Sequence, residues 1–126
     1  MLLWPVAAAA RSEMQYAYAF DKVWPTSLRF LKIDEKVKIV EKDQEAGYIV
    51  FELTQDKKTF TGTAEYVKET DRRGRKATKL IVKIADRPEY VEQGILDRFD
   101  RKLREDLGPP PDPPPEPKKD VVEKKK

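Results

Sequence analysis

Four short segments with alternating apolar and polar residues, joined by short polar connections, restrict the folds open to this chain. The segments cover residues 36–42, 47–54, 59–68 and 77–85. Successive side chains of a strand point to opposite faces, so this alternation predicts strands with one buried face. The connections DQEAG, QDK and TDRRGR are too short for a crossover between parallel strands. The pattern therefore predicts a four-stranded antiparallel meander.

Two amphipathic segments flank these strands and predict helices. The first is DKVWPTSLRFLK, residues 21–32, with Asp21 as the expected N-cap. The second begins at DRPE, where Asp86 and Glu89 are spaced as in a capping box, and it ends at Gly108. The apolar stripes consist of Phe20, Trp24, Leu28 and Leu31 in the first helix and Val91, Ile95, Leu96, Phe99, Leu103 and Leu107 in the second.

These elements predict one α+β domain over residues 20–107, with the order α-β-β-β-β-α. A meander with one apolar face needs a cover, so we expect both helices to pack on the same face of the sheet. Gly62 and Ala64 leave space on the inner face of the third strand. Trp24 is the large side chain expected to fill that space.

The two ends of the chain differ in composition from this domain. The sequence MLLWPVAAAARSE is apolar and ends in small residues, so residues 1–19 are interpreted as an N-terminal tail or a partial signal peptide. A signal peptide predicts a periplasmic or secreted protein, whereas an uncleaved tail leaves a cytoplasmic location open. The apolar stretch is too short to span a bilayer. Residues 108–126 are proline-rich and end in lysines, which predicts a disordered spacer.

The chain contains neither cysteine nor histidine. It therefore lacks a thiol nucleophile, the commonest general base and the commonest metal ligand. A glycine-rich phosphate loop and a G-x-S-x-G motif are also missing from the sequence. We expect no enzymatic activity, no metal and no cofactor.

If both helices cover one face of the sheet, the other face stays open to a partner. The alternation places aromatic, β-branched and threonine side chains on that open face. This mixture predicts contact with a protein or a component of the cell envelope. The residues expected to make that contact are Tyr48, Val50, Thr61, Thr63 and Ile81.

A basic loop at residues 71–76 supports an alternative function. The loop carries Arg72, Arg73, Arg75 and Lys76 at a predicted hairpin tip, where basic side chains can meet phosphates. This arrangement predicts a cytoplasmic nucleic-acid-associated module. The formal net charge of +3 argues against it, because nucleic-acid binders usually carry a larger basic excess.

The segment VWPTSLRFLKIDEKVKIVEKDQEAGYIVFEL, residues 23–53, resembles a known pattern. It is similar to the small helix-plus-sheet domains of the outer-membrane assembly lipoprotein of the NlpB/BamC kind, in which a Trp-containing helix precedes a hairpin. The chain also resembles uncharacterised bacterial secreted proteins. The resemblance implies an envelope setting and an interaction role, and it implies no active residues. The matching positions are Val23, Trp24, Leu28, Leu31, Asp43, Gly47 and Tyr48.

Overall fold

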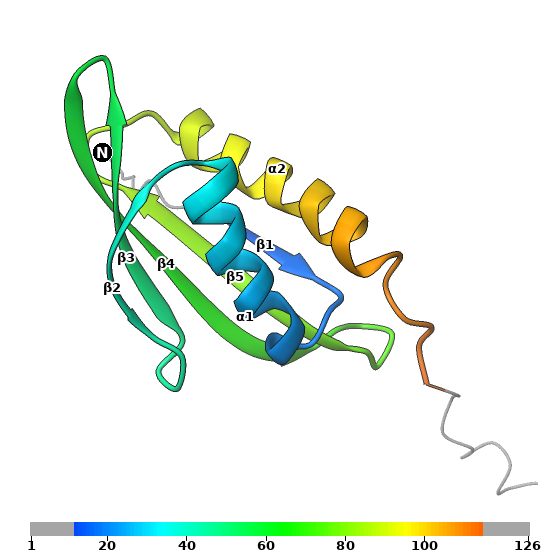
Figure 1. The fold of residues 1–126 in the computed structure, drawn as a ribbon. Helices are drawn as coiled ribbons and strands as arrows, with labels where there is room; N and C mark the ends of the chain where they lie inside the picture. Colours follow the sequence, from blue (N-terminus) through cyan, green and yellow to red (C-terminus); the bar gives the residue numbers. More distant parts are fainter. Residues whose placement is uncertain (1–11, 115–126) are drawn as a thin grey trace, which may run out of the picture.

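The computed structural model describes residues 12–114, which form one antiparallel sheet with two α-helices (Figure 1). The sheet has five strands in the order β1-β5-β4-β3-β2. Strands β2 to β5 form the predicted meander, and the α+β class is confirmed. The elements are β1 (Ser12–Tyr16), α1 (Phe20–Arg29), a π-helical segment η1 (Phe30–Asp34), β2 (Lys38–Asp43), β3 (Tyr48–Gln55), β4 (Lys58–Thr70), β5 (Lys76–Ile84) and α2 (Glu89–Leu107).

Strand β1 was not predicted, because its residues were assigned to the N-terminal tail. It pairs antiparallel with β5, from Ser12 opposite Val82 to Tyr16 opposite Thr78. Strand β5 is therefore an interior strand with a neighbour on each side. The interpretation as a signal peptide concerns mainly residues 1–11, which lie outside the described part of the chain.

Both helices pack on the same face of the sheet, as predicted (Figure 1). Tyr16 of β1 meets Phe99 of α2 edge to face, with ring centroids 5.3 Å apart, and its hydroxyl donates to the Leu96 carbonyl at 2.8 Å. Phe30 contacts the same Phe99 ring. The space left between helices and sheet is only about 10 Å³, so side chains fill the interior.

Trp24 is buried, as predicted, with 4% of its surface exposed. Its ring lies 5.2 Å from that of Tyr66 on β4. The prediction that Trp24 fills the space beside Gly62 was wrong. The Phe51 ring takes that space, since a Cβ added at Gly62 would come within 2.5 Å of Phe51 Cε1 and Cζ.

Of the helix ends predicted from the sequence, the C-terminal end of α2 is confirmed and the two N-caps are not. Gly108 ends α2 in the left-handed region, with φ of 80°, as predicted. The N-caps are Ala19 and Pro88, and neither forms a side-chain cap bond, so the caps predicted at Asp21 and Asp86 do not form. Within residues 12–114, neither helix is long and apolar enough to cross a membrane.

The first residues of the proline-rich tail, 109–114, form neither helix nor strand. Pro114 lies beside the hairpin that joins β4 to β5, since a Cβ added at Gly74 would be 3.2 Å from Pro114 Cγ. Residues 115–126, where the spacer prediction continues, lie outside the described part of the chain.

Candidate functional site

The sheet face opposite the helices carries all five residues predicted to contact a partner. Val50 on β3 pairs with Thr63 on β4, and Glu52 pairs with Thr61. Their sequence neighbours Ile49, Phe51 and Leu53 point to the other side and are buried under the helices. The structure brings together on this open face Tyr48, Val50, Thr61, Thr63 and Ile81.

The five residues differ in accessibility. Thr61 is exposed, while Tyr48, Val50 and Thr63 are half-buried. Ile81 is only 8% exposed, because β1 makes β5 an interior strand and places Glu13 beside it. Ile81 therefore offers little surface to a partner.

Carboxylates border the aromatic and aliphatic side chains on the open face. Glu65 pairs with Tyr48, and Glu41 on β2 pairs with Val50. The Tyr48 hydroxyl donates a hydrogen bond to Glu41. This bond, helped by partial burial, raises the pKa of Tyr48. Glu52 lies on the same face, and so do Lys38, which pairs with Glu52, and Lys83, which pairs with Thr63. The apolar centre is therefore bordered by charges of both signs, with the carboxylates next to Tyr48 and Val50.

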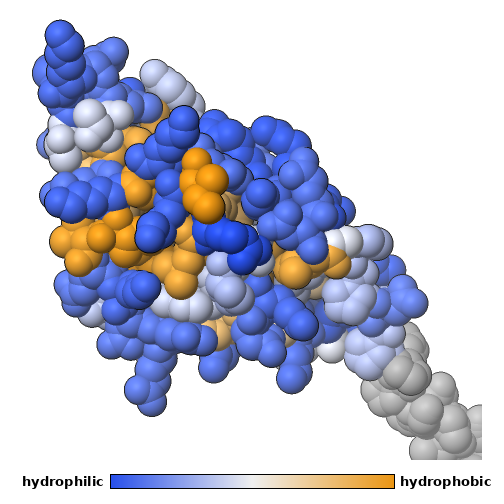
Figure 2. Space-filling model, in the orientation of Figure 1, coloured by the Kyte–Doolittle hydropathy of each residue, from blue (hydrophilic) through white to orange (hydrophobic). Residues whose placement is uncertain are grey.

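Strand β2 forms the outer edge of the sheet. It carries exposed apolar side chains but is poorly suited to pairing with a strand of another chain. Val40 is 53% exposed and nearby Ile33 is 62% exposed. Figure 2 shows hydrophobic surface gathered over β2, at the left of the view, while the outer surface of the helices is mostly hydrophilic. The pairing register shifts at Val40, and Lys38 and Lys42 flank the shift. Bulges and lysines on an edge strand oppose the addition of another strand.

The predicted basic loop is organised around a carboxylate. Asp71 Oδ1 accepts hydrogen bonds from the backbone N–H groups of Arg73 and Arg75 at 2.9 and 2.8 Å, and Oδ2 accepts from Arg75 Nε at 2.8 Å. Burial raises the pKa of Asp71, but these hydrogen bonds outweigh it and leave the pKa below its usual value. Arg75 is thus neutralised within the loop. Arg72 and Arg73 remain exposed at the tip.

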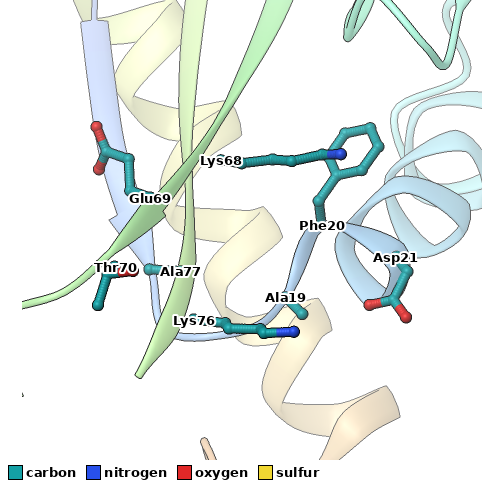
Figure 3. Close-up of a pocket in the computed structure, with 8 residues that line it drawn as sticks. All are labelled: Ala19, Phe20, Asp21, Lys68, Glu69, Thr70, Lys76 and Ala77. Atoms are coloured by element: carbon teal, nitrogen blue, oxygen red, sulfur yellow. The ribbon is translucent and has the colours of Figure 1, made fainter. Parts of the chain in front are cut away.

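Lys76, the last of the predicted nucleic-acid contacts, faces a groove of about 520 Å³. The groove lies between the start of α1, the end of β4 and the start of β5 (Figure 3). Lys68 Nζ lies 5.1 Å from the centroid of the Phe20 ring across this groove. The residues that line it are Ala19, Phe20, Asp21, Lys68, Glu69, Thr70, Lys76 and Ala77.

Glu92 is a fully buried carboxylate that the sequence interpretation missed. Its Oε2 accepts from the Ile84 backbone N–H at 2.7 Å, and its Oε1 accepts from Ser12 Oγ at 3.0 Å. Within the described residues β1 begins at Ser12, opposite Val82, and beyond this point Glu92 supplies the acceptor for the Ile84 amide. This geometry assigns Glu92 a structural role at the end of the sheet.

Two tyrosines of the core also have perturbed pKa values. Burial raises the pKa of Tyr16 and, to a lesser degree, that of Tyr66, whose hydroxyl is hydrogen-bonded to Ser27. Both rings belong to the core and neither reaches a cavity that could hold a substrate. Within the described residues, no group of Asp and Glu side chains is arranged to bind a metal ion.

Comparisons with known proteins leave the family open. No family model matches the chain, and no curated protein matches it. Among solved structures, DR_A0006 from Deinococcus radiodurans is 11% identical with a TM-score of 0.47, covering 79% of this chain and 97% of that one. Ara h 8.0201 is 14% identical with a TM-score of 0.39, covering 75% and 96%. At these TM-scores neither likeness assigns a function to this chain.

Proposed function

We propose that this chain is a non-catalytic interaction module that binds a protein partner through the open face of its sheet. The supporting observation is that both helices cover the opposite face, so that within residues 12–114 no helix lies over this one. The filled interior also favours a function at the surface. The centre of the proposed contact is Tyr48, Val50, Thr61 and Thr63.

The partner binds with basic side chains around an apolar group. Val50 lies between Glu41 and Thr63 in the pairing register, and Glu65 lies beside Tyr48. A basic partner segment neutralises these carboxylates, whereas an acidic one places like charges together at a cost of several kcal/mol.

Site-specific cross-linking tests the contact surface. A photoreactive amino acid placed at Thr61 should capture the partner in cells, while the same residue at Glu105, exposed on α2, should not. The captured protein is then purified, and its affinity is measured against salt. Glu65→Lys should weaken its binding by about ten-fold or more, while Glu105→Lys should leave it unchanged. Equal capture from both positions, or an unaffected Glu65→Lys variant, would overturn the proposal.

The proposed location is the bacterial envelope, either periplasmic or secreted. The signal-like N-terminal sequence supports this location. Fractionation of cells that produce the native gene product tests it. Recovery of the protein in the periplasmic or culture fraction is the expected result, and recovery in the cytosol alone would contradict it.

A further inference from the structure

The β4–β5 hairpin extends beyond the strands on either side of it. Strand β3 pairs with β4 only as far as Glu65, and β1 pairs with β5 only as far as Thr78. Beyond these points β4 and β5 pair, among the described strands, with each other alone, up to Thr70 opposite Lys76. This ribbon places Lys68, Thr70 and Lys76 on the side that faces α1.

The groove between this ribbon and α1 has room for a small molecule. Its volume of about 520 Å³ falls in the range of ligand sites. The Lys68 side chain reaches across to the Phe20 ring, and the Lys76 side chain extends toward Ala19 (Figure 3). Phe20 therefore gives the groove an aromatic wall, and the two lysines give it ammonium groups.

The two lysines are not neutralised by the carboxylates next to them. Glu69 turns to the open face, where it accepts from Gln15 Nε2 at 2.7 Å and lies 3.5 Å from Lys79 Nζ. Asp71 is held by the basic loop. Among residues 12–114, neither Lys68 nor Lys76 forms an ion pair, and the groove's remaining carboxylate is Asp21 at its rim. The groove thus keeps an excess of positive charge.

We propose that this groove binds the phosphate group of a small phosphorylated molecule. Lys68 and Lys76 are diagonal neighbours on one face of an antiparallel pair, so their Cα atoms lie about 7–8 Å apart and both flexible side chains can reach one anion. Two ammonium groups match the charge of a phosphate dianion, and the Thr70 hydroxyl adds a donor. The Phe20 ring is placed to contact the organic part of the ligand.

Titration of the full chain with inorganic phosphate and with adenosine monophosphate, followed by amide NMR shifts, tests the proposal. Saturable shifts are expected at Phe20, Lys68 and Thr70, with tighter binding of the nucleotide than of phosphate. The double variant Lys68→Gln/Lys76→Gln should weaken binding by about ten-fold or more. The matched control is Lys58→Gln/Lys83→Gln, which removes the same charge from exposed positions outside the groove and should bind as the unmodified chain does.

Three outcomes would overturn the proposal. The first is the absence of saturable shifts at the groove with either probe. The second is an equal loss of affinity in the groove variant and its control, which indicates nonspecific charge attraction. The third is binding of single-stranded RNA, centred on Arg72 and Arg73, with no response to either small probe; this result favours the nucleic-acid alternative. A thermal unfolding curve of each variant verifies that it is folded.

Discussion

Gly62 on β4 leaves no room for a side chain, and replacing it by alanine tests the packing of the core. A Cβ at this position would lie 2.5 Å from Phe51 Cε1 and Cζ and 3.2 Å from Ile84 Cγ1. Carbon atoms in contact prefer about 3.5–4.0 Å, so the ring must move by about 1 Å. Phe51 is fully buried, and its neighbours oppose that movement.

The expected cost of Gly62→Ala follows from two opposing terms. Forcing extra volume into a packed core costs about 1–3 kcal/mol. Replacing glycine by alanine at a compatible backbone position gains about 0.4–1 kcal/mol through the unfolded chain. The overpacking term is larger, so we expect the free energy of unfolding to fall by about 1–2 kcal/mol.

A double-mutant cycle with Phe51→Leu identifies the cause of this loss. Leucine lacks the two ring atoms that meet the new methyl group, so Gly62→Ala should cost nothing or become slightly stabilising in that background. Urea unfolding followed by circular dichroism measures all four chains, and the expected coupling energy is about 1–3 kcal/mol. Thr61→Ser, on the exposed face of the same strand, should stay within about 0.5 kcal/mol of the unmodified chain.

Two results would refute this reasoning. If Gly62→Ala is neutral in the unmodified chain, the Phe51 ring does not lie over the glycine. If the substitution costs the same with leucine at position 51, the loss has another origin, such as the backbone of β4.

Three further predictions concern ionisable groups. Glu92→Leu leaves the Ile84 amide unpaired and should cost about 1–3 kcal/mol with faster hydrogen exchange at that amide, while Glu92→Gln should cost less; the reverse order would contradict the structural role. Above about pH 10, Tyr16 and Tyr66 lose their phenolic protons in the unfolded chain but keep them in the folded one. The free energy of unfolding should therefore fall by about 1.4 kcal/mol per pH unit for each tyrosine. A urea midpoint that stays constant between about pH 9 and 11 would contradict this. The ionised Asp71 carboxylate stabilises the hairpin loop, and this stabilisation is complete when the pH lies above 3.8, the ordinary pKa of the group. As the pH falls through the lowered pKa, amide shifts of the loop should report the loss of its order.

The sequence predicted the fold class well because alternation and helical periodicity report burial directly. It missed β1, a strand of five residues, because these residues were assigned to the N-terminal tail. The signal was present, since Met14, Tyr16 and Tyr18 alternate with more polar or smaller neighbours. The apolar residues before them suggested a leader segment instead.

The candidate sites were harder to predict, because they depend on where strands end. Glu92 lies on the apolar face of α2, four residues before Leu96, and a charged residue at such a position indicates a buried partner. Lys68 and Thr70 continue the inward series of β4 beyond Tyr66, where they face the groove beside the start of α1. The strand boundaries that turn these polar positions into a groove come from tertiary pairing and not from local pattern.

The two proposed surfaces lie on opposite faces of one strand, and this placement lets each be tested separately. In β4 the odd-numbered residues face the proposed protein contact, and the even-numbered residues face the core and then the groove. Glu65→Lys should therefore weaken the partner without changing phosphate binding, and Lys68→Gln should do the reverse. If either substitution impairs both activities while the fold is intact, the two surfaces are coupled through β4, and their assignment to independent ligands is wrong.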